Sequence, residues 1–255
     1  MKTVQWGIIG PGSIAANFAQ GLAECDHGTL YAIASRDEKR CQTFGDRFSV
    51  PSEGWFRSYD DLLASPLVEA VYIATPHPFH AELAIRALRA GKHVVVEKPA
   101  GLIPGEVVAM TEVAEETGLF FMEGFMYRCH PQIERLVELI GGGEIGKVQH
   151  IEASFGFAST YNPTSRLDRP DLAGGAILDV GVYPVSFARL VAGAAQGLLF
   201  AEPLEIQGIG SLGPMGVDET AYALLKFDQD ITASCATSIR RAMENSATVI
   251  GSKGR

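Results

Sequence analysis

The feature that most constrains the fold is a glycine-rich turn near the start of the chain. An apolar run, Val4 to Ile9, leads directly into Gly10-Pro11-Gly12-Ser13-Ile14-Ala15. This order matches the dinucleotide fingerprint Gly-x-Gly-x-x-Gly/Ala, in which a strand turns sharply into a helix. Gly10 permits the turn, Gly12 lets a pyrophosphate approach the backbone, and Ala15 lets the helix pack closely on the strand. The residues expected to contact the cofactor phosphates at the helix amino terminus are Gly10, Gly12, Ser13 and Ile14.

The first half of the chain alternates short apolar runs with amphipathic helical stretches, as parallel strands joined by crossover helices do. The further expected strands are Leu30–Ser35, Val68–Thr75, Val94–Val96 and Leu119–Glu123. The expected helices are Ser13–Leu22, Glu38–Arg47, Phe79–Ala90 and Pro104–Gly118. We therefore predict a doubly wound Rossmann sheet over residues 1–125.

After about residue 125 the runs become longer and alternate in polarity, which is typical of antiparallel strands. The expected strands are Lys147–Phe157, Leu204–Ser211, Ala221–Phe227 and Ile231–Ser238, and the expected helices are Pro131–Ile140 and about Asp179–Val191. Ala158 to Ala173 is polar and is expected to form a long surface loop. The predicted class is α/β: a Rossmann domain, then an α+β domain over 126–255 with a mainly antiparallel open sheet. The last residues resemble a strand without its return strand, so this second domain is expected to be incomplete at its C-terminus.

Composition excludes several classes of partner. The formal charge of −9 makes nucleic acid an unfavourable ligand. The opening residues lack the regions of a signal peptide, and no apolar run approaches the roughly 20 residues of a membrane helix, so we expect a cytoplasmic protein. The four cysteines, Cys25, Cys41, Cys129 and Cys235, are scattered, and His77 and His80 have no ligand partners at suitable spacing. No metal site is expected.

The residues after the second expected strand bear on the choice of cofactor. An acidic residue at this position accepts a hydrogen bond from the ribose 2′-hydroxyl of NAD, whereas an arginine accommodates the 2′-phosphate of NADP. The chain has Ser35-Arg36-Asp37 here and Arg40 one turn later. Ser35, Arg36 and Arg40 favour NADP, while Asp37 leaves NAD open. The alternative interpretation of Arg36 and Arg40 is that they are solvated surface charges.

Two further motifs carry residues suited to proton transfer. Glu97-Lys98-Pro99 follows the buried run Val94–Val96, so Lys98 emerges at the carboxyl end of the sheet, where doubly wound folds bind ligands. A partly desolvated lysine near an oxidised nicotinamide has a lowered pKa. Asp179 and Tyr183 are spaced i and i+4, which places them on one face of a helix. An acid and a phenol that converge on Lys98 would form a proton-handling group. The alternatives are an ordinary loop lysine, a helix cap and a core tyrosine.

Together and in this order, these motifs resemble those of the Gfo/Idh/MocA oxidoreductase family over essentially the whole chain. The specific marks are Glu97-Lys98-Pro99 and the Gly-Gly-Ala-x-Leu-Asp-x-Gly-x-Tyr segment from Gly174 to Tyr183. The segment from Thr75 to His80 is similar to the family's Thr-Pro-x-x-x-His stretch beside the nicotinamide. Many members carry histidine where this chain has Tyr183. The tyrosine version is similar to dimeric dihydrodiol dehydrogenases and NADP-dependent xylose dehydrogenases.

The resemblance implies roles for individual residues. It implies Tyr183 as the acid/base and Lys98 as its electrostatic partner. Our own hypothesis adds Asp179 as the group that orients the substrate or the pair. The resemblance also implies NADP as cofactor, with Ser35 and Arg40 at the 2′-phosphate and Arg36 near the adenine. The remaining expected cofactor contacts are Thr75, Pro76, His80, Glu97 and Lys98. Independently of the resemblance, the candidate contacts for substrate hydroxyls are Arg128, Tyr161, Arg166 and Asp168. The alternative for each of them is a surface charge or a phenol at the edge of the core.

We therefore predict an NAD(P)-dependent oxidoreductase that transfers a hydride between the nicotinamide and a sugar, cyclic diol or related secondary alcohol, and that forms a homodimer. One alternative is a non-catalytic dinucleotide-binding sensor or regulator of the same fold. Such regulators tend to lose the lysine that this chain keeps as Lys98. Another alternative is a hydrolase that uses bound NAD in an internal redox cycle. Family members usually continue past the position of Arg255, so a truncated chain is expected.

Overall fold

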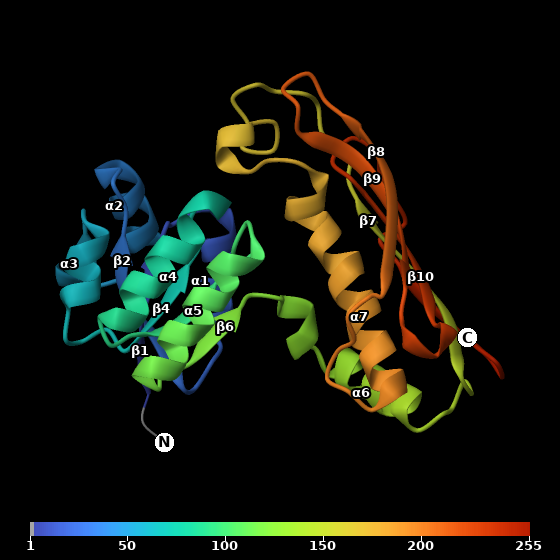
Figure 1. Cartoon of the computed structure of the whole chain (residues 1–255). Helices are drawn as coiled ribbons and strands as arrows, with labels where there is room; N and C mark the ends of the chain where they lie inside the picture. Colours follow the sequence, from blue (N-terminus) through green and yellow to red (C-terminus); the bar gives the residue numbers. More distant parts are fainter. Residues whose placement is uncertain (1–2) are drawn as a thin grey trace. The chain divides into compact units, whose positions relative to one another are not determined.

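A six-stranded parallel sheet forms the centre of the first part of the chain (Figure 1). The computed structural model describes residues 3–255, so Met1 and Lys2, which begin the predicted first domain, lie outside the described residues. The spatial order is β3-β2-β1-β4-β5-β6, and every neighbouring pair is parallel. The strands are β1 (Val4–Ile9), β2 (Gly28–Ala34), β3 (Trp55–Phe56), β4 (Ala70–Ile73), β5 (His93–Val96) and β6 (Phe121–Glu123). This is the doubly wound order, and the predicted fold is confirmed.

Helices cover both faces of this sheet because successive strand residues point to opposite sides. Ile8 and Ile9 in β1 are both fully buried, yet Ile8 packs with α1 and α2, whereas Ile9 belongs to the core with α3, α4 and α5. The elements on the two faces are α1 (Ser13–Ala23), α2 (Glu38–Arg47), α3 (Tyr59–Ala64), α4 (His80–Arg89) and α5 (Pro104–Thr117), with short 3-10 turns η1 (Ser52–Gly54) and η2 (His77–Phe79). The two cores fill the faces of the sheet, and the loops that follow the strands lie at the carboxyl ends of the strands.

The chain divides after Gly124, and the unit from Phe125 to Arg255 contains a five-stranded sheet in the order β11-β7-β10-β9-β8. Its strands are β7 (Val148–Gly156), β8 (Glu205–Leu212), β9 (Asp218–Lys226), β10 (Thr232–Ser238) and β11 (Ala247–Gly251). The β7 and β10 pair is parallel, and the other three pairs are antiparallel. The predicted mainly antiparallel sheet is therefore confirmed.

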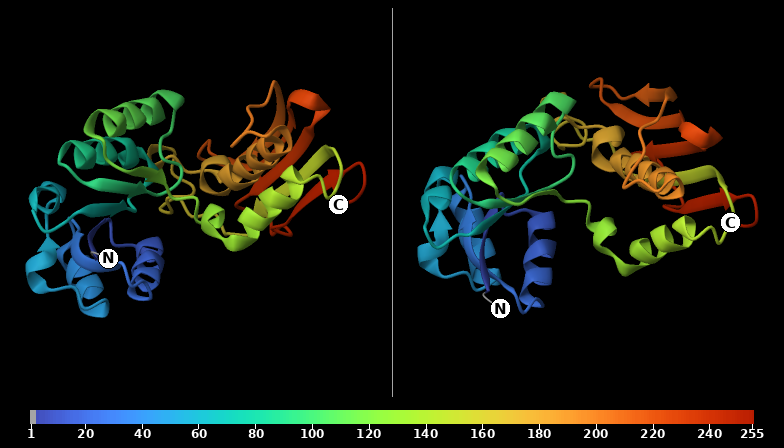
Figure 2. Two further views of the ribbon diagram at one scale, coloured as in Figure 1. Left: turned by 90° about the horizontal axis from the view of Figure 1, so that it is seen from below. Right: turned by 60° about the horizontal axis from the view of Figure 1, so that its bottom comes forward.

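One long helix packs along one face of this second sheet, as the two views of Figure 2 show. Ala188, Val191 and Ala192 of this helix lie in one core with Ile151 of β7 and Ala233 of β10. The helical elements of the unit are η3 (Met126–Cys129), α6 (Pro131–Gly141), η4 (Pro170–Leu172), the π-helix η5 (Ile177–Gly181), α7 (Val182–Gln196) and η6 (Asp228–Asp230). The opposite face of the sheet carries no helix among the described residues (Figure 1).

One segment has the length and apolarity of a membrane span, which the sequence does not lead us to expect. Pro170–Gln196 reaches a mean hydropathy of 1.4 over its most apolar window. However, 61% of that window is buried inside the fold. Because α7 lies in this segment and supplies the core of the second sheet, packing accounts for its apolar composition.

The four thiols differ in access to solvent, which gives a direct test of the fold. Cys41 and Cys235 are buried, whereas Cys25 and Cys129 are exposed. Burial raises the pKa of the Cys41 thiol and raises that of Cys235 to about 11. Since the thiolate is the reacting form, we expect an alkylating reagent near neutral pH to modify Cys25 and Cys129 in the native protein, and Cys41 and Cys235 only after denaturation. Peptide mass mapping measures this, and rapid native modification of Cys235 would contradict the fold.

Candidate active site

The glycine-rich turn forms an open cradle between β1 and α1. Gly10 has a φ of +87°, and a Cβ there would lie 3.0 Å from the backbone of Ala74, so this position requires glycine. Gly12 is extended, and a Cβ on it would meet only the Gly10 carbonyl oxygen, at 4.0 Å. Gly12 is the N-cap of α1 and provides no side-chain cap, and the first turn contains no acidic residue. The open space and the helix amino terminus fit the pyrophosphate of a dinucleotide.

The residues after β2 fit the adenosine end of the same ligand. Ser35 is buried, and its Oγ accepts a hydrogen bond from the Asp37 backbone N–H at 3.2 Å. The Asp37 carboxylate caps α2 by accepting from the Arg40 backbone N–H at 3.0 Å. Arg36 is exposed, and its guanidinium carbon lies 5.9 Å from the ring centre of Phe79. The Asp37 carboxylate is thus used as a helix cap, and Arg36 and Arg40 are exposed.

The loops after β4 and β5 meet at the same edge of the sheet, because these strands are parallel neighbours. His80 links them: its Nδ1 lies 2.8 Å from the Pro99 carbonyl oxygen and its Nε2 lies 2.7 Å from the Thr75 carbonyl oxygen. Burial lowers the pKa of His80, while these two carbonyl contacts act in the opposite direction. His80 has no exposed surface, and its two ring nitrogens hold the two loops together.

Three other residues of these loops have distinct surroundings. The Thr75 hydroxyl is buried and has no hydrogen-bond partner among residues 3–255, which suits a polar group of a ligand. Glu97 is buried and accepts hydrogen bonds from the Tyr72 hydroxyl and, at 3.3 Å, from the Lys98 backbone N–H. Lys98 is half-buried and follows β5 directly. This edge therefore combines a lysine, a held carboxylate and an unpartnered hydroxyl.

The second unit carries the predicted acid and phenol on two different kinds of helix. Asp179 lies in the π-helix η5, and Tyr183 lies in the first turn of α7. The Val182 backbone N–H bonds to the Ile177 carbonyl, five residues earlier, as a π-helix requires. Pro184 has no N–H to give the Val180 carbonyl, so its presence disfavours a regular α-helical turn here. The expected continuous helix from about Asp179 is corrected to a π-helix followed by α7.

Both side chains are held by neighbours within the second unit. Asp179 is 4% exposed, and its Oδ1 accepts from Nη2 of Arg166 at 2.8 Å. The ring of Tyr183 lies 5.2 Å from that of Phe155 and 5.7 Å from that of Phe125, measured between ring centres. The Tyr127 ring is 6.1 Å away. The ion-paired carboxylate of Asp179 thus lies just before α7. The phenol of Tyr183, packed among aromatic rings, lies in the first turn of α7.

The candidate hydroxyl contacts have other partners in the fold. Asp168 is 1% exposed and forms an ion pair with Arg240, so the expectation that it contacts substrate is wrong. Arg166 pairs with Asp179, and Nη2 of Arg128 donates to the Ser186 hydroxyl at 3.3 Å. Tyr161 is exposed. Sequence reasoning missed Arg240 entirely, because nothing local distinguishes it from a surface arginine. No group of three or more potential metal ligands occurs within the described part of the chain.

Comparison with known proteins identifies the family of the chain. The model of an oxidoreductase family with an NAD-binding Rossmann fold, Gfo/Idh/MocA, matches residues 4–125, and the Gfo/Idh/MocA C-terminal domain matches residues 133–255. The chain belongs to the Gfo/Idh/MocA oxidoreductase family. Its first unit is the NAD-binding domain of that family, and the predictions of a nicotinamide dinucleotide cofactor and of an NAD(P)-dependent oxidoreductase are confirmed.

Several members of the family are similar to this chain over nearly all of its length. Trans-1,2-dihydrobenzene-1,2-diol dehydrogenase of Mus musculus is 35% identical over 254 residues, which are 98% of this chain and 73% of the mouse protein. A 3-ketoreductase from Actinomadura kijaniata, solved with NADP and TDP-benzene, has a TM-score of 0.84 and 32% identity over 98% of this chain and 74% of its own. Aldose-aldose oxidoreductase from Caulobacter crescentus, complexed with glycerol, has a TM-score of 0.86 and 27% identity over 98% and 75%. These Gfo/Idh/MocA relatives are dehydrogenases, reductases or oxidoreductases.

Proposed function

We propose that this protein catalyses the reversible oxidation of a secondary alcohol in a sugar or cyclic diol, with NADP as the preferred cofactor. The observation that carries the proposal is the Tyr183 phenol, which packs among aromatic rings four residues after the ion-paired Asp179. The same chain has Lys98 at the carboxyl edge of a dinucleotide-binding sheet. The names of the relatives support the substrate class, since they include a diol dehydrogenase, a ketoreductase and an aldose oxidoreductase.

The proposed roles follow from the chemistry of each group. When bound, the nicotinamide supplies the redox chemistry by exchanging a hydride with the substrate carbon. Tyr183 takes the hydroxyl proton during oxidation and returns it during reduction. The resemblance to the family supports Lys98 as the proposed electrostatic partner of Tyr183, since a cation near a phenol would favour its phenolate form. Asp179, itself held by Arg166, orients the substrate or the tyrosine. The rings of Phe125 and Phe155 pack against Tyr183 and shield part of it from water, which would strengthen the electrostatic interactions of its phenol.

The preference for NADP rests on Ser35, Arg36 and Arg40. Asp37 caps α2 with its carboxylate, whereas Arg36 and Arg40 are exposed cations at the same end of β2. Replacing both arginines with alanine should raise the KM for NADP by about 10- to 100-fold, because each removes a charge-assisted contact to the 2′-phosphate. The KM for NAD should change little. Steady-state kinetics with both cofactors measure this, with Lys39→Ala as the matched control, and an equal loss for NAD and NADP would refute the assignment.

We also propose that the chain forms a homodimer in the cytoplasm through the face of the second sheet that α7 leaves uncovered. Ile209 pairs with Tyr222 in the antiparallel register, so both side chains point to one face, and Leu224 lies two residues further on the same face. All three are exposed, Ile209 at 76%. Such a contiguous apolar patch marks an interaction surface.

The dimer prediction is tested by a charge on that face. Ile209→Asp should convert a dimer of 27.3 kDa chains to monomers, because a buried unpaired carboxylate opposes association. Light scattering after size exclusion measures the mass. Leu67→Asp, a change at an exposed leucine of the first unit, is the control and should leave the dimer intact. A wild-type monomer, or a dimer that survives in Ile209→Asp, would exclude this surface.

The function itself is tested by a panel of sugars and cyclic diols assayed with NADP and with NAD, monitored at the absorbance band of the reduced nicotinamide. We expect at least one polyol to reduce NADP in repeated turnovers. Cofactor binding without any turnover across the panel would favour the sensor alternative. Cofactor that copurifies and cycles without net reduction would favour the internal redox cycle.

A further inference from the structure

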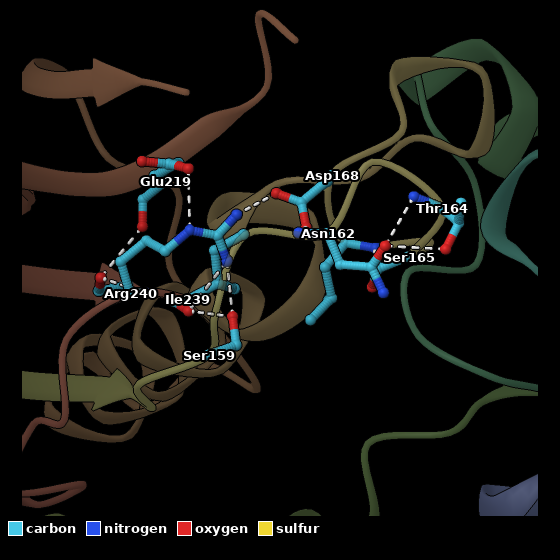
Figure 3. Close-up of polar contacts among 10 residues, drawn as sticks. Ser159, Asn162, Thr164, Ser165, Asp168, Glu219, Ile239 and Arg240 are labelled. Carbon is cyan, nitrogen blue, oxygen red and sulfur yellow. Dashed lines mark hydrogen bonds and ion pairs between the residues drawn. The ribbon is translucent and has the colours of Figure 1, made fainter. Parts of the chain in front are cut away.

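A single arginine after β10 holds the long loop of the second unit in place. Arg240 lies between two carboxylates, as Figure 3 shows: its Nε donates to Glu219 at 2.8 Å, and its Nη2 forms an ion pair with Asp168. Its Nη1 donates to the Ser159 hydroxyl at 2.6 Å. The side chains of Arg240 and Asp168 are only 15% and 2% exposed. Because the guanidinium makes several directed hydrogen bonds, it fixes the positions of its partners more firmly than a solvated ion pair on the surface would.

Asp168 carries this constraint into the loop from Ala158 to Ala173. Its Oδ2 accepts from the Asn162 backbone N–H at 3.2 Å, and its own backbone N–H bonds to the Ser165 carbonyl at 3.1 Å. Asn162 in turn accepts from the backbone and hydroxyl of Thr164 (Figure 3). The segment from Asn162 to Asp168 is therefore closed on itself and attached to the sheet through Arg240.

The same loop lies directly against the segment that leads to the proposed catalytic residues. The Gly175 backbone N–H bonds to the Leu167 carbonyl at 2.9 Å, and a Cβ on Gly174 would lie 2.5 Å from that same oxygen. One residue before Leu167, Arg166 forms its 2.8 Å ion pair with Asp179. Arg166 and Asp168 are thus two residues apart, and each pairs with an opposite charge elsewhere in the unit.

We propose that Arg240 is a positioning residue: by holding Asp168 it sets the place of Arg166 and, through Arg166, the place of Asp179 in the turn before Tyr183. This inference rests on the proposed roles of Asp179 and Tyr183. The Arg240 guanidinium contacts Asp168, Glu219 and Ser159 rather than Asp179 or Tyr183. Its effect passes from Asp168 to Arg166, two residues apart in the loop, because Asp168 pairs with Arg240 and Arg166 pairs with Asp179.

Kinetics separate positioning from a general loss of stability. Arg240→Met should lower kcat by about 30-fold, since a small displacement of an orienting group costs this much, while the Kd of NADPH stays unchanged. Arg240→Lys should recover part of the loss, because a lysine keeps the charge without the fork of donors. Asp168→Asn, which keeps the side-chain volume, provides the test if Arg240→Met does not fold. Arg135→Met, at an exposed ion pair on α6, is the matched control and should change nothing.

A double-mutant cycle tests the route through Arg166. If Arg240 acts through Arg166, the loss in kcat for Arg166→Met combined with Arg240→Met should be no larger than that of the worse single variant. If the fold-losses in kcat of the two single variants multiply in the double variant, the proposal is overturned.

Hydrogen exchange read by mass spectrometry tests the same route without turnover. In Arg240→Met, amides of residues 158–173 and 176–183 should exchange faster than in the wild type and in Arg135→Met, with the first unit unchanged. Unchanged exchange over 176–183 would overturn the inference. This readout stands even if Tyr183→Phe retains full activity, an outcome that would refute the proposed function alone.

Discussion

Tyr183→Phe should lower kcat by about 100- to 10,000-fold, the contribution of a positioned acid/base group, while the Kd of NADPH stays unchanged. The phenylalanine ring can keep the packing against Phe155 and Phe125, whose ring centres lie 5.2 and 5.7 Å away, so only the phenolic oxygen is lost. Stopped assays of polyol oxidation give kcat, fluorescence titration gives the Kd, and thermal unfolding checks the fold.

A second tyrosine of the same aromatic cluster provides the control for Tyr183→Phe. The Tyr127 hydroxyl lies 2.9 Å from the Ser186 hydroxyl, and its ring is 6.1 Å from that of Tyr183. Tyr127→Phe removes one ordinary hydrogen bond and should keep kcat within about tenfold of the wild type. If Tyr183→Phe turns over as fast as Tyr127→Phe, the phenol of Tyr183 is not the acid/base group.

Gly12→Asp should weaken NADPH binding by at least about 100-fold, because it brings a carboxylate against the cofactor pyrophosphate. The fold should be unaffected or slightly more stable. Gly12 has a φ of −108°, a Cβ there meets only one atom within 4 Å, and aspartate is a good N-cap for the helix that follows. Binding titration and Tm therefore move independently in this variant.

Gly21→Ala is the control for Gly12→Asp. Gly21 is in the same helix, α1, and a Cβ there meets no atom within 4 Å, so both NADPH affinity and Tm should be retained or the latter slightly raised. Tight NADPH binding by Gly12→Asp would mean that the phosphates do not lie over this turn.

The Rossmann half was predictable because its signals are local. Apolar runs of parallel strands and a glycine turn between strand and helix are read within a few residues. The residues from Trp55 to Ala64 are the exception: β3 has only two residues, and α3 has six, too short for either periodicity to show. The predicted strand from Leu119 begins two residues late, at Phe121, because the Leu119 backbone N–H ends α5 by bonding to Ala114.

The second unit was predictable in class but not in the segment that carries the proposed catalytic residues. In the π-helix before Tyr183, the Ile177 backbone N–H donates at 2.7 Å to Asp218, which lies 41 residues away in the chain. Burial raises the pKa of Asp218, against this hydrogen bond. Likewise, Asp168 pairs with Arg240, which lies 72 residues further along the chain. From the sequence alone, a charge in a polar loop is therefore interpreted as a surface group.

Some of the site residues could likewise be placed from the sequence, and others could not. Gly10, Gly12 and Lys98 follow strand ends, where topology alone predicts their position. His80 was expected to contact the cofactor, yet its two ring nitrogens lie against the carbonyls of Thr75 and Pro99. That arrangement depends on how two loops meet and has no local sequence signal.

The central claim is that this chain exchanges a hydride between a nicotinamide cofactor and the carbon of a polyol. Its most direct test is to incubate the protein with the keto form of a substrate from the panel and with NADPH deuterated at the transferred position, and to analyse the alcohol by mass spectrometry. The account predicts deuterium on the carbinol carbon of the product with the wild type and almost none with Tyr183→Phe. Product without deuterium at that carbon would contradict the central claim, and equal labelling by both proteins would contradict the role of Tyr183 as the acid/base group.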